Sequence, residues 1–335
     1  MLTALCFILS AVAIYIACEY FVNGIEWLGE RFRLGATATG TVLAAFGTAL
    51  PESAVTAIAV LGGHTPEQKD IGVGAAMGGP LVLATLAYAV VGGALLWHRR
   101  KLGRADSCLQ ADYPQLVRDQ RWFLIIFACK CALGLLAFAW KPWLGVLFLL
   151  AYALYVWREL SRDQPADEDG DEVLEPLKIR PRAGHPGLGW IVLQTVAAML
   201  VITVASRIFV HQIEAIGTGL QLSAHLVALL LSPVATELPE TMNALIWMRQ
   251  GKERLALANI SGAMMIQATI PSALGIFATP WHFDTTLALA GVMTMLAVLW
   301  LWLAFRCGRV KAQHLLCGAG FYLAFVLLLV MHLRH

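Results

Sequence analysis

Carboxylates stand beside prolines in two stretches of this sequence that are otherwise apolar. The first stretch contains Pro51 and Glu52, and the second reads Glu237-Leu238-Pro239-Glu240. An ionised side chain inside a membrane is costly unless it faces a cavity or a partner. Proline has no backbone N–H, so it also frees a carbonyl, which inside a membrane must line a cavity or bind an ion. These residue types at this spacing predict a functional site within the membrane.

The second stretch is a copy of the first. A Thr-x-Leu-Pro-Glu core runs from Thr48 to Glu52 and again from Thr236 to Glu240, and the two cores lie 188 residues apart. The glycine-containing segment 74–79 recurs as 258–263, so the chain is an internal duplication. One proline kink alone would favour a role in helix packing, whereas a Pro-Glu pair in both halves favours a binding site.

The composition predicts an all-α polytopic membrane protein. Hydrophobic residues make up 59% of the chain and charged residues only 14%, whereas soluble domains carry about 25% charged residues. Apolar runs long enough to span a bilayer predict ten transmembrane helices, at 2–22, 36–62, 71–97, 122–139, 142–158, 188–211, 214–250, 254–278, 284–305 and 312–333.

The positions of Lys and Arg predict how these helices are oriented. If both termini lie outside the cell membrane, on the extracellular or periplasmic side, most of the 24 basic residues fall in inward loops. These loops then contact lipid head groups of the bilayer, and nucleic acid is not an expected partner. The acidic segment 159–187 becomes a cytoplasmic linker between the halves. Its run 167–172 is typical of a solvated tether, and the alternative is a regulatory Ca2+ site, although EF-hand spacing is missing.

Five predicted helices precede the linker, so the second copy is inverted relative to the first. We expect one five-helix repeat at residues 1–158, with its motif at 45–83, and another at 188–335, with its motif at 232–267. Inverted repeats with broken helices at the midplane are typical of secondary transporters, which bind substrate where the breaks meet. Transport needs no covalent chemistry, so we predict neither an enzyme nor a cofactor.

The two motifs resemble those of a known family. Segments 47–52 and 235–240 resemble the paired Gly-Thr-Ser-x-Pro-Glu motifs of the cation/Ca2+ exchanger superfamily, which contains Na+/Ca2+ and H+/Ca2+ antiporters. The family's later Gly-Asn-x-x-Gly-Ser motif is matched by 258–263, and in the first copy only by Gly74 and Gly78. The resemblance covers the motif helices directly, and the ten-helix layout extends it to the whole chain.

The resemblance implies a secondary active antiporter that exchanges a divalent cation, Ca2+ first, for H+ or Na+ by alternating access. In that family the two motif glutamates bind Ca2+ with help from hydroxyls and carbonyls. Carried over, the principal ligands are Glu52 and Glu240. The expected helpers are the side chains of Thr48, Thr236, Asn259 and Gln267 and the carbonyls of Ala45 and Pro233. Oxygen ligands suit a hard cation, and two carboxylates neutralise a divalent charge.

The sequence departs from the family at several oxygen ligands. The motif serines are replaced by Ala49 and Glu237, and the later serines by Gly79 and Ala263. The missing oxygens disfavour Na+ as the coupling ion.

Glu237 introduces a third carboxylate. It lies three residues before Glu240, so both face one side of the helix if the helix stays wound across Pro239. Two neighbouring carboxylates in a poorly solvated site favour retention of a proton near neutral pH. We predict that Glu237 carries a coupled proton and is part of the metal site; the alternative is that it reaches a mouth of the cavity.

Other functions stay open on the residues alone. Met77, Met264 and Met265 lie beside the repeat glycines, and thioethers suit softer metals, so a Mn2+ or Fe2+ exchanger is an alternative, as is a Mg2+ exchanger. Methionine is also a common gap-filler between helices. A membrane cation sensor that binds metal without transport is a rival. An intramembrane hydrolase would use Glu52 and Glu240 as acid and base, but the duplicated symmetry has no use there and no nucleophile motif is evident.

Overall fold

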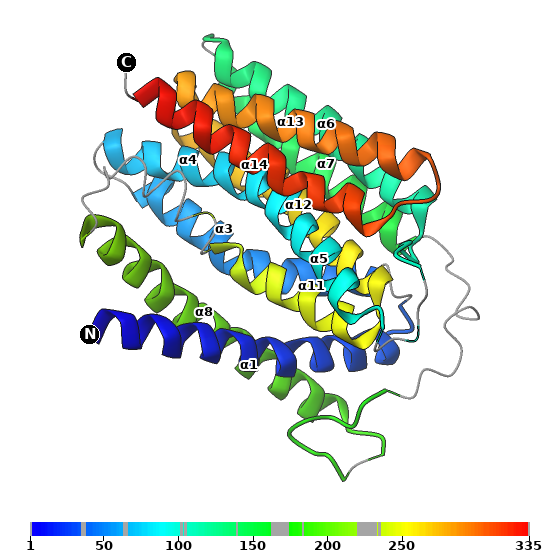
Figure 1. Cartoon of the computed structure of the whole chain (residues 1–335). Helices are drawn as coiled ribbons and strands as arrows, with labels where there is room; N and C mark the ends of the chain where they lie inside the picture. The colour runs from blue at the N-terminus through cyan, green and yellow to red at the C-terminus, as the bar shows by residue number, and fades with distance from the viewer. Residues whose placement is uncertain are drawn as a thin grey trace.

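The computed structural model describes residues 2–34, 38–62, 66–100, 103, 106–138, 140–161, 174–182, 184–219, 233 and 236–333. Over these residues the chain is almost wholly helical, and the helices lie side by side in one bundle (Figure 1). The helices of the first half are α1 (Leu2–Arg31), η1 (Thr39–Ala44), α3 (Ala45–Gly62), α4 (Pro66–Val82), η2 (Leu83–Ala87), α5 (Tyr88–His98), α6 (Tyr113–Leu135), η3 (Lys141–Leu144) and α7 (Gly145–Leu160). Those of the second half are α8 (Leu188–Gly219), α11 (Leu238–Gln250), α12 (Glu253–Ala278), α13 (Thr285–Arg306) and α14 (Ala312–Leu333).

The predicted all-helical membrane fold is confirmed. The short stretches η1, η2 and η3 join neighbouring helices, so the described residues form ten helical segments. Seven of these segments are long and apolar enough to cross a membrane.

Two predicted bounds are each wrong by nine residues: α1 ends at Arg31 instead of residue 22, and α6 begins at Tyr113 instead of residue 122. The first turns of α6 carry Gln115, Asp119 and Gln120, which lower the hydropathy although all three are buried. Asp112 caps the helix by accepting a hydrogen bond from the Gln115 backbone N–H at 2.9 Å. The boundary near 211–214 is also wrong, because α8 continues to Gly219.

The interruptions expected near the first motif are wide π-helical turns. One is η1, directly before α3, and the other is η2, between α4 and α5. Helix α3 itself continues through Pro51, and α4 continues through Pro80. Such π-helical insertions are rare and occur frequently at functional sites. They flank the segment of the first repeat that carries the acidic motif.

The helix contacts follow the predicted inverted duplication. Helix α1 packs on its counterpart α8, and the two run in opposite directions (Figure 1). Helix α5 packs on α14, and the equivalent pair, α12 and α7, is also in contact. Helix α6 packs on its counterpart α13. These exchanged contacts are those expected of two inverted repeats related by a two-fold axis.

Two glycine contacts bring the motifs together, and the duplication relates them to each other. A Cβ added at Gly78 would lie 2.5 Å from Cγ of Pro233, and one at Gly262 would lie 2.8 Å from Cβ of Ala45. Gly78 and Gly262 are repeat equivalents, as are Ala45 and Pro233. Each glycine therefore allows its helix to approach the motif of the other half.

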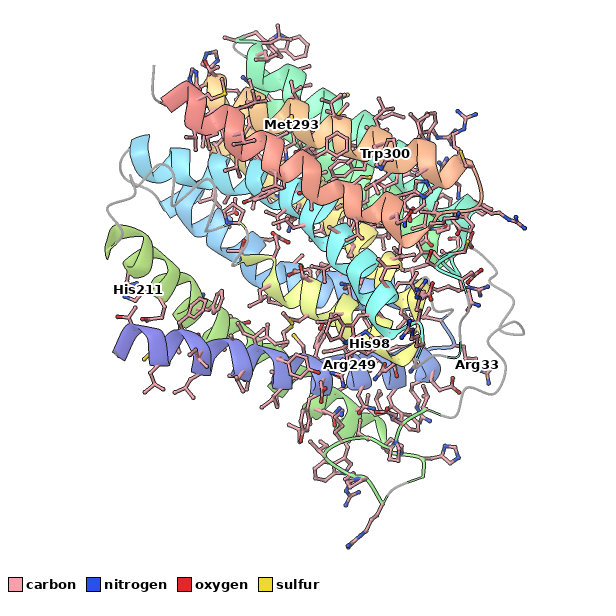
Figure 2. All side chains as sticks on the ribbon, viewed as in Figure 1. Arg33, His98, His211, Arg249, Met293 and Trp300 are labelled. Atoms are coloured by element: carbon pink, nitrogen blue, oxygen red, sulfur yellow. The ribbon has the colours of Figure 1, made fainter. Side chains whose placement is uncertain are left out.

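The two ends of the bundle carry different features. Arg33, His98 and Arg249 come from three predicted inward loops, and they lie at the same end (Figure 2). The N- and C-terminal ends of the chain lie at the opposite end (Figure 1). This arrangement agrees with the grouping of loops from which the orientation was predicted.

The last part of the linker is anchored to the bundle. The Glu175 carbonyl accepts hydrogen bonds from the Asn23 side chain at 3.3 Å and from the Trp27 indole at 3.0 Å. Leu177 is fully buried, and the Ile179 backbone N–H donates to the Gln194 side chain at 2.9 Å. The acidic run 167–172 lies outside the described residues.

Candidate functional site

Glu237 and Glu240 lie inside the bundle at the start of α11, and both side chains are 0% exposed. The Thr241 backbone N–H donates to the Glu237 carbonyl at 3.1 Å, and the Glu237 N–H donates to the Pro233 carbonyl at 3.0 Å. These i to i+4 bonds keep the chain wound across Pro239, as required for the two carboxylates to share one face. Glu237 is shielded from solvent and does not open onto a mouth in this conformation.

Gln267 and Gly79 surround the Glu237 carboxylate. Gln267 Nε2 donates a hydrogen bond to Glu237 Oε1 at 2.6 Å. A Cβ at Gly79 would lie 2.7 Å from Glu237 Oε1 and 2.5 Å from Gln267 Oε1, so any side chain there would require the ends of these two side chains to shift. The two departures from the family, at positions 79 and 237, therefore fit each other: the long side chain of Glu237 occupies the space that the missing side chain of Gly79 leaves on α4.

Gly79→Ala is expected to destabilise the protein, by about 1–3 kcal/mol, because the new methyl group overlaps both oxygens. Glu237→Ser shortens one of the two side chains that the new methyl group would meet. Gly79→Ala should therefore lower the free energy of unfolding by less in the Glu237→Ser protein than in the wild type. Thermal unfolding of the four proteins in this double-mutant cycle measures the difference. Gly74→Ala is the matched control and should be neutral or slightly stabilising, because nothing lies within 4 Å of a Cβ there. Equal losses on both backgrounds would contradict the contact.

Two asparagines lie at the same depth on the hairpin that joins α11 and α12. Asn243 lies eight residues before Gly251 and Asn259 eight residues after it, and both are 0% exposed. Asn259 Nδ2 donates to the backbone carbonyl of Glu240 at 3.2 Å. Its Oδ1 atom, and the whole amide of Asn243, form no hydrogen bond with any described residue. Asn259 was predicted as a ligand, whereas Asn243 was missed.

The signal for Asn243 was its spacing. It lies one turn beyond Glu240, so Glu237, Glu240 and Asn243 follow one another on a single face of α11. A buried amide without a partner is costly, which makes Asn243 a further candidate for contact with a cation or water.

The threonines of the two motifs occupy equivalent places. The Thr48 hydroxyl lies 3.1 Å from the Ala44 carbonyl and 3.4 Å from the Ala45 carbonyl, and it donates within this pair. The Thr236 hydroxyl donates to the Pro233 carbonyl at 3.2 Å. A hydroxyl that donates its hydrogen to a carbonyl still presents lone pairs to a cation. Glu52 lies on α3 one turn after Thr48, but its side chain lies outside the described residues.

The geometry brings most of the predicted ligands to the meeting point of the repeats. Gly262 of the second repeat packs against Ala45, which lies just before Thr48 on α3, and Gly78 of the first repeat packs against Pro233. Among described His, Cys, Asp and Glu residues, no group of three or more is placed to hold a metal ion. A cation site formed by the described side chains would combine Glu237 and Glu240 with amide, hydroxyl and carbonyl oxygens.

The methionines do not add a clear sulfur site. Met77 Cε lies 3.2 Å from the position of a Cβ at Gly291, so this side chain packs on α13. Met264 and Met265 are buried in the same core. Packing of this kind is the gap-filling role of methionine.

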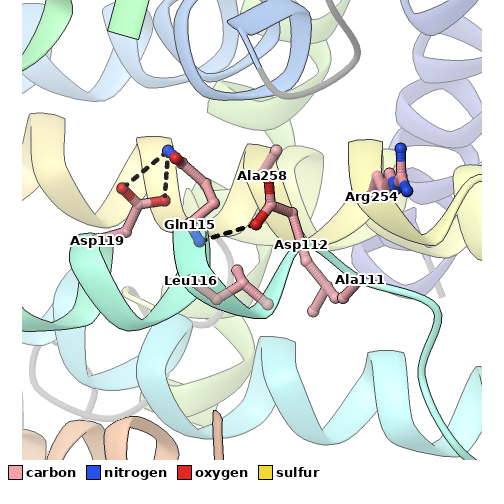
Figure 3. A pocket seen from close by; sticks show the side chains of 8 residues that line it. Ala111, Asp112, Gln115, Leu116, Asp119, Arg254 and Ala258 are labelled. Atoms are coloured by element: carbon pink, nitrogen blue, oxygen red, sulfur yellow. Dashed lines mark hydrogen bonds between the residues drawn. The ribbon is translucent and has the colours of Figure 1, made fainter. Parts of the chain in front are cut away.

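A second polar cluster lies where α6 begins, separate from the acidic motif (Figure 3). Gln115 Nε2 donates to Glu159 at 2.8 Å and to Asp119 at 3.2 Å, and thereby joins α6 to α7. The adjoining cavity has a volume of about 10 Å³, room for one water, and Arg254 and Ala258 of α12 also line it. The cluster fixes α6 against the helices that carry the site.

Known proteins match this chain along nearly its full length. The family model described as sodium/calcium exchanger protein matches residues 2–160 and 190–333. Putative antiporter CaxA of Alkalimonas amylolytica is 23% identical over 332 residues, which cover 97% of this chain and 97% of that protein. Inner membrane protein YrbG of Escherichia coli K12 is 26% identical over 284 residues, which cover 84% of this chain and 81% of that protein.

A solved structure has the same fold. The sodium-calcium exchanger NCX_Mj, in a crystal soaked with Na+ and Sr2+, aligns with a TM-score of 0.74 at 19% sequence identity. The alignment covers 97% of this chain and 98% of that one. At this level of identity the likeness concerns the fold alone.

Proposed function

Because this chain belongs to the sodium/calcium exchanger family, whose members are membrane transporters and not enzymes, we propose that it is a secondary active antiporter for a divalent cation. Ca2+ is the first candidate substrate, and H+ is favoured over Na+ as the coupling ion. The observation that carries the proposal is the pair of fully buried carboxylates, Glu237 and Glu240, at the meeting point of two inverted repeats. Carboxylates buried within membrane-spanning bundles mark ion pathways.

The ligands that we propose for the divalent cation come from both repeats. Glu240 and Glu52 supply carboxylate oxygens, which hard cations prefer. The remaining oxygens come from the side chains of Thr48, Thr236, Asn259 and Gln267 and the carbonyls of Ala45 and Pro233. Glu237 joins this set and carries the coupled proton. Gln267 donates a hydrogen bond to its carboxyl group and holds that group in place within the site.

Exchange follows from the cost of moving an empty acidic site. A divalent cation and the coupling ion compete for overlapping carboxylates, so only one of them is bound at a time. An uncompensated negative charge is too costly to carry through the membrane interior, and reorientation therefore requires a bound cation. Helices α1 and α8 lie together along one side of the bundle, which makes them the candidate gating group (Figure 1).

The proposed topology follows from the same placement of charges. We place both termini on the extracellular or periplasmic side of the cell membrane, the repeats at 1–158 and 188–335, and the linker 159–187 in the cytoplasm. The shared end occupied by Arg33, His98 and Arg249 supports this orientation (Figure 2).

Uptake by proteoliposomes tests the coupling ion. Purified protein is reconstituted, and uptake of Ca2+, Mn2+ and Mg2+ is measured under an imposed H+ gradient or an imposed Na+ gradient. We expect Ca2+ uptake with the H+ gradient and little with the Na+ gradient, because several oxygens of the family's Na+ sites are missing. Metal binding without uptake under either gradient would instead favour the sensor.

A further inference from the structure

Lys130 places a positive charge inside the bundle. It lies on α6, its side chain is 0% exposed, and its ammonium group lies 4.8 Å from the centre of the Phe127 ring. Lys130 Nζ donates a hydrogen bond of 2.7 Å to the backbone carbonyl of Ala76 on α4. A buried ammonium is costly, so its retention at this depth needs a reason.

The carbonyl that receives this bond is released by a proline. Inside α4, the carbonyl of Ala76 would normally accept from the backbone N–H four residues later, but that residue is Pro80, which has none. A freed carbonyl within a membrane protein is tolerated where it binds an ion or another donor. In this chain the cation at that carbonyl is the side chain of Lys130.

The same turn of α4 borders the acidic site. Gly79 lies one turn after Ala76 and directly before Pro80, and it is the position at which a Cβ would collide with Glu237 Oε1. Residues three apart on a helix are neighbours on one face. The ammonium of Lys130 and the carboxylate of Glu237 therefore both lie against the turn of α4 that runs from Ala76 to Gly79.

A count of charges suggests what the lysine does. Glu52, Glu237 and Glu240 carry three negative charges when all are ionised, whereas a divalent cation brings two positive ones. One ammonium balances the remainder. A neutral donor such as glutamine would satisfy the Ala76 carbonyl at a lower desolvation cost, so this one hydrogen bond does not by itself require a positive charge.

We propose that Lys130 is a built-in monovalent cation of the transport site. Its ammonium takes the position that a free monovalent cation would otherwise fill, so the protein exchanges one fewer monovalent cation for each divalent cation. This inference rests on the proposed antiport function and adds to it the origin of the coupling ratio.

Three variants separate the charge of Lys130 from its hydrogen bond. Lys130→Gln keeps a donor for the Ala76 carbonyl and removes the charge, whereas Lys130→Arg keeps both. Pro80→Ala supplies a backbone N–H for that carbonyl and leaves the lysine in place. Ca2+ binding to each purified protein is titrated while H+, Na+ or K+ is varied alone, and the steepness of the competition counts the monovalent cations displaced.

The proposal predicts that Lys130→Gln gains about one monovalent cation in this count, while Lys130→Arg and Pro80→Ala match the wild type. A second readout needs no divalent cation. The thermal midpoint of Lys130→Gln should rise in Na+ or K+ relative to choline at equal ionic strength, by more than that of the wild type. The same count and the same salt response in Lys130→Gln and wild type would overturn the built-in cation. Failure of the wild-type protein to bind Ca2+ would instead count against the proposed function, and the salt response would then decide the inference.

Discussion

Glu240→Gln is expected to abolish divalent-cation exchange. Glu240 is fully buried on the face of α11 that also carries Glu237 and Asn243, and it is one of the two carboxylates that we propose as principal ligands. Replacing a carboxylate by an amide removes one charge from a site that must offset a divalent cation. We expect flux to fall by about a hundredfold or more, equivalent to about 2.7 kcal/mol.

Uptake of Ca2+ and equilibrium Ca2+ binding, measured on the same preparation, check this result. Glu19→Gln is the matched control, because Glu19 is a partly exposed acid whose carboxylate lies 3.7 Å from Lys178 and 3.6 Å from Arg249. It should leave both quantities within a few-fold of wild type, since exposed ion pairs contribute little. If Glu240→Gln retained the flux of the wild type, the Glu240 carboxylate would not be a ligand of the transported cation.

Glu237→Gln is expected to remove the dependence of transport on the H+ gradient. The substitution keeps the shape of the side chain and an oxygen that accepts the bond from Gln267, but it removes the group that takes up a proton. Ca2+ uptake driven by H+ should fall at least tenfold. Exchange of Ca2+ for Ca2+ across the same membrane needs no proton, so it should fall less than H+-driven uptake, although Glu237 also contributes an oxygen to the proposed metal site.

The comparison of these two fluxes in one preparation decides the role of Glu237. Loss of both would make it a structural or metal-binding residue without a separate proton function. Unchanged H+-driven uptake in the variant would show that the coupled proton resides elsewhere.

The helices were predictable where lipid alone dictates their composition. Helices α12, α13 and α14 begin and end within one residue of the predicted 254–278, 284–305 and 312–333. The start of α6 was misplaced because Gln115, Asp119 and Gln120 are buried by contacts with other helices. A hydropathy pattern reads such polar residues as part of an exposed loop.

The site was predictable as far as its duplicated motif reaches. Thr48 contacts the carbonyls of Ala44 and Ala45, and Thr236 contacts that of Pro233, all within single helical turns, so spacing alone was sufficient to group these residues. The exchange between Gly79 and Glu237 was not predictable, because it joins two helices that are distant in the sequence.

Lys130 shows the same limit. Lys130 falls within the predicted helix 122–139, but its partner carbonyl could not be predicted, because a long side chain reaches it from α6 to α4. The release of that carbonyl by Pro80, in contrast, is a local effect that can be read from the sequence.

The most direct test of the account is whether cation release requires a counter-ion. Proteoliposomes loaded with Ca2+ are diluted into medium that contains choline as its only added cation. Both sides are buffered at the same alkaline pH, where little H+ is available to bind the site, and efflux is followed before and after external H+ or Ca2+ is supplied. The account predicts negligible efflux in choline and rapid efflux once either ion is added, because the empty carboxylate site does not reorient. Rapid efflux in choline would indicate a channel, and no efflux under any condition despite Ca2+ binding would indicate a sensor; either result would contradict obligate exchange.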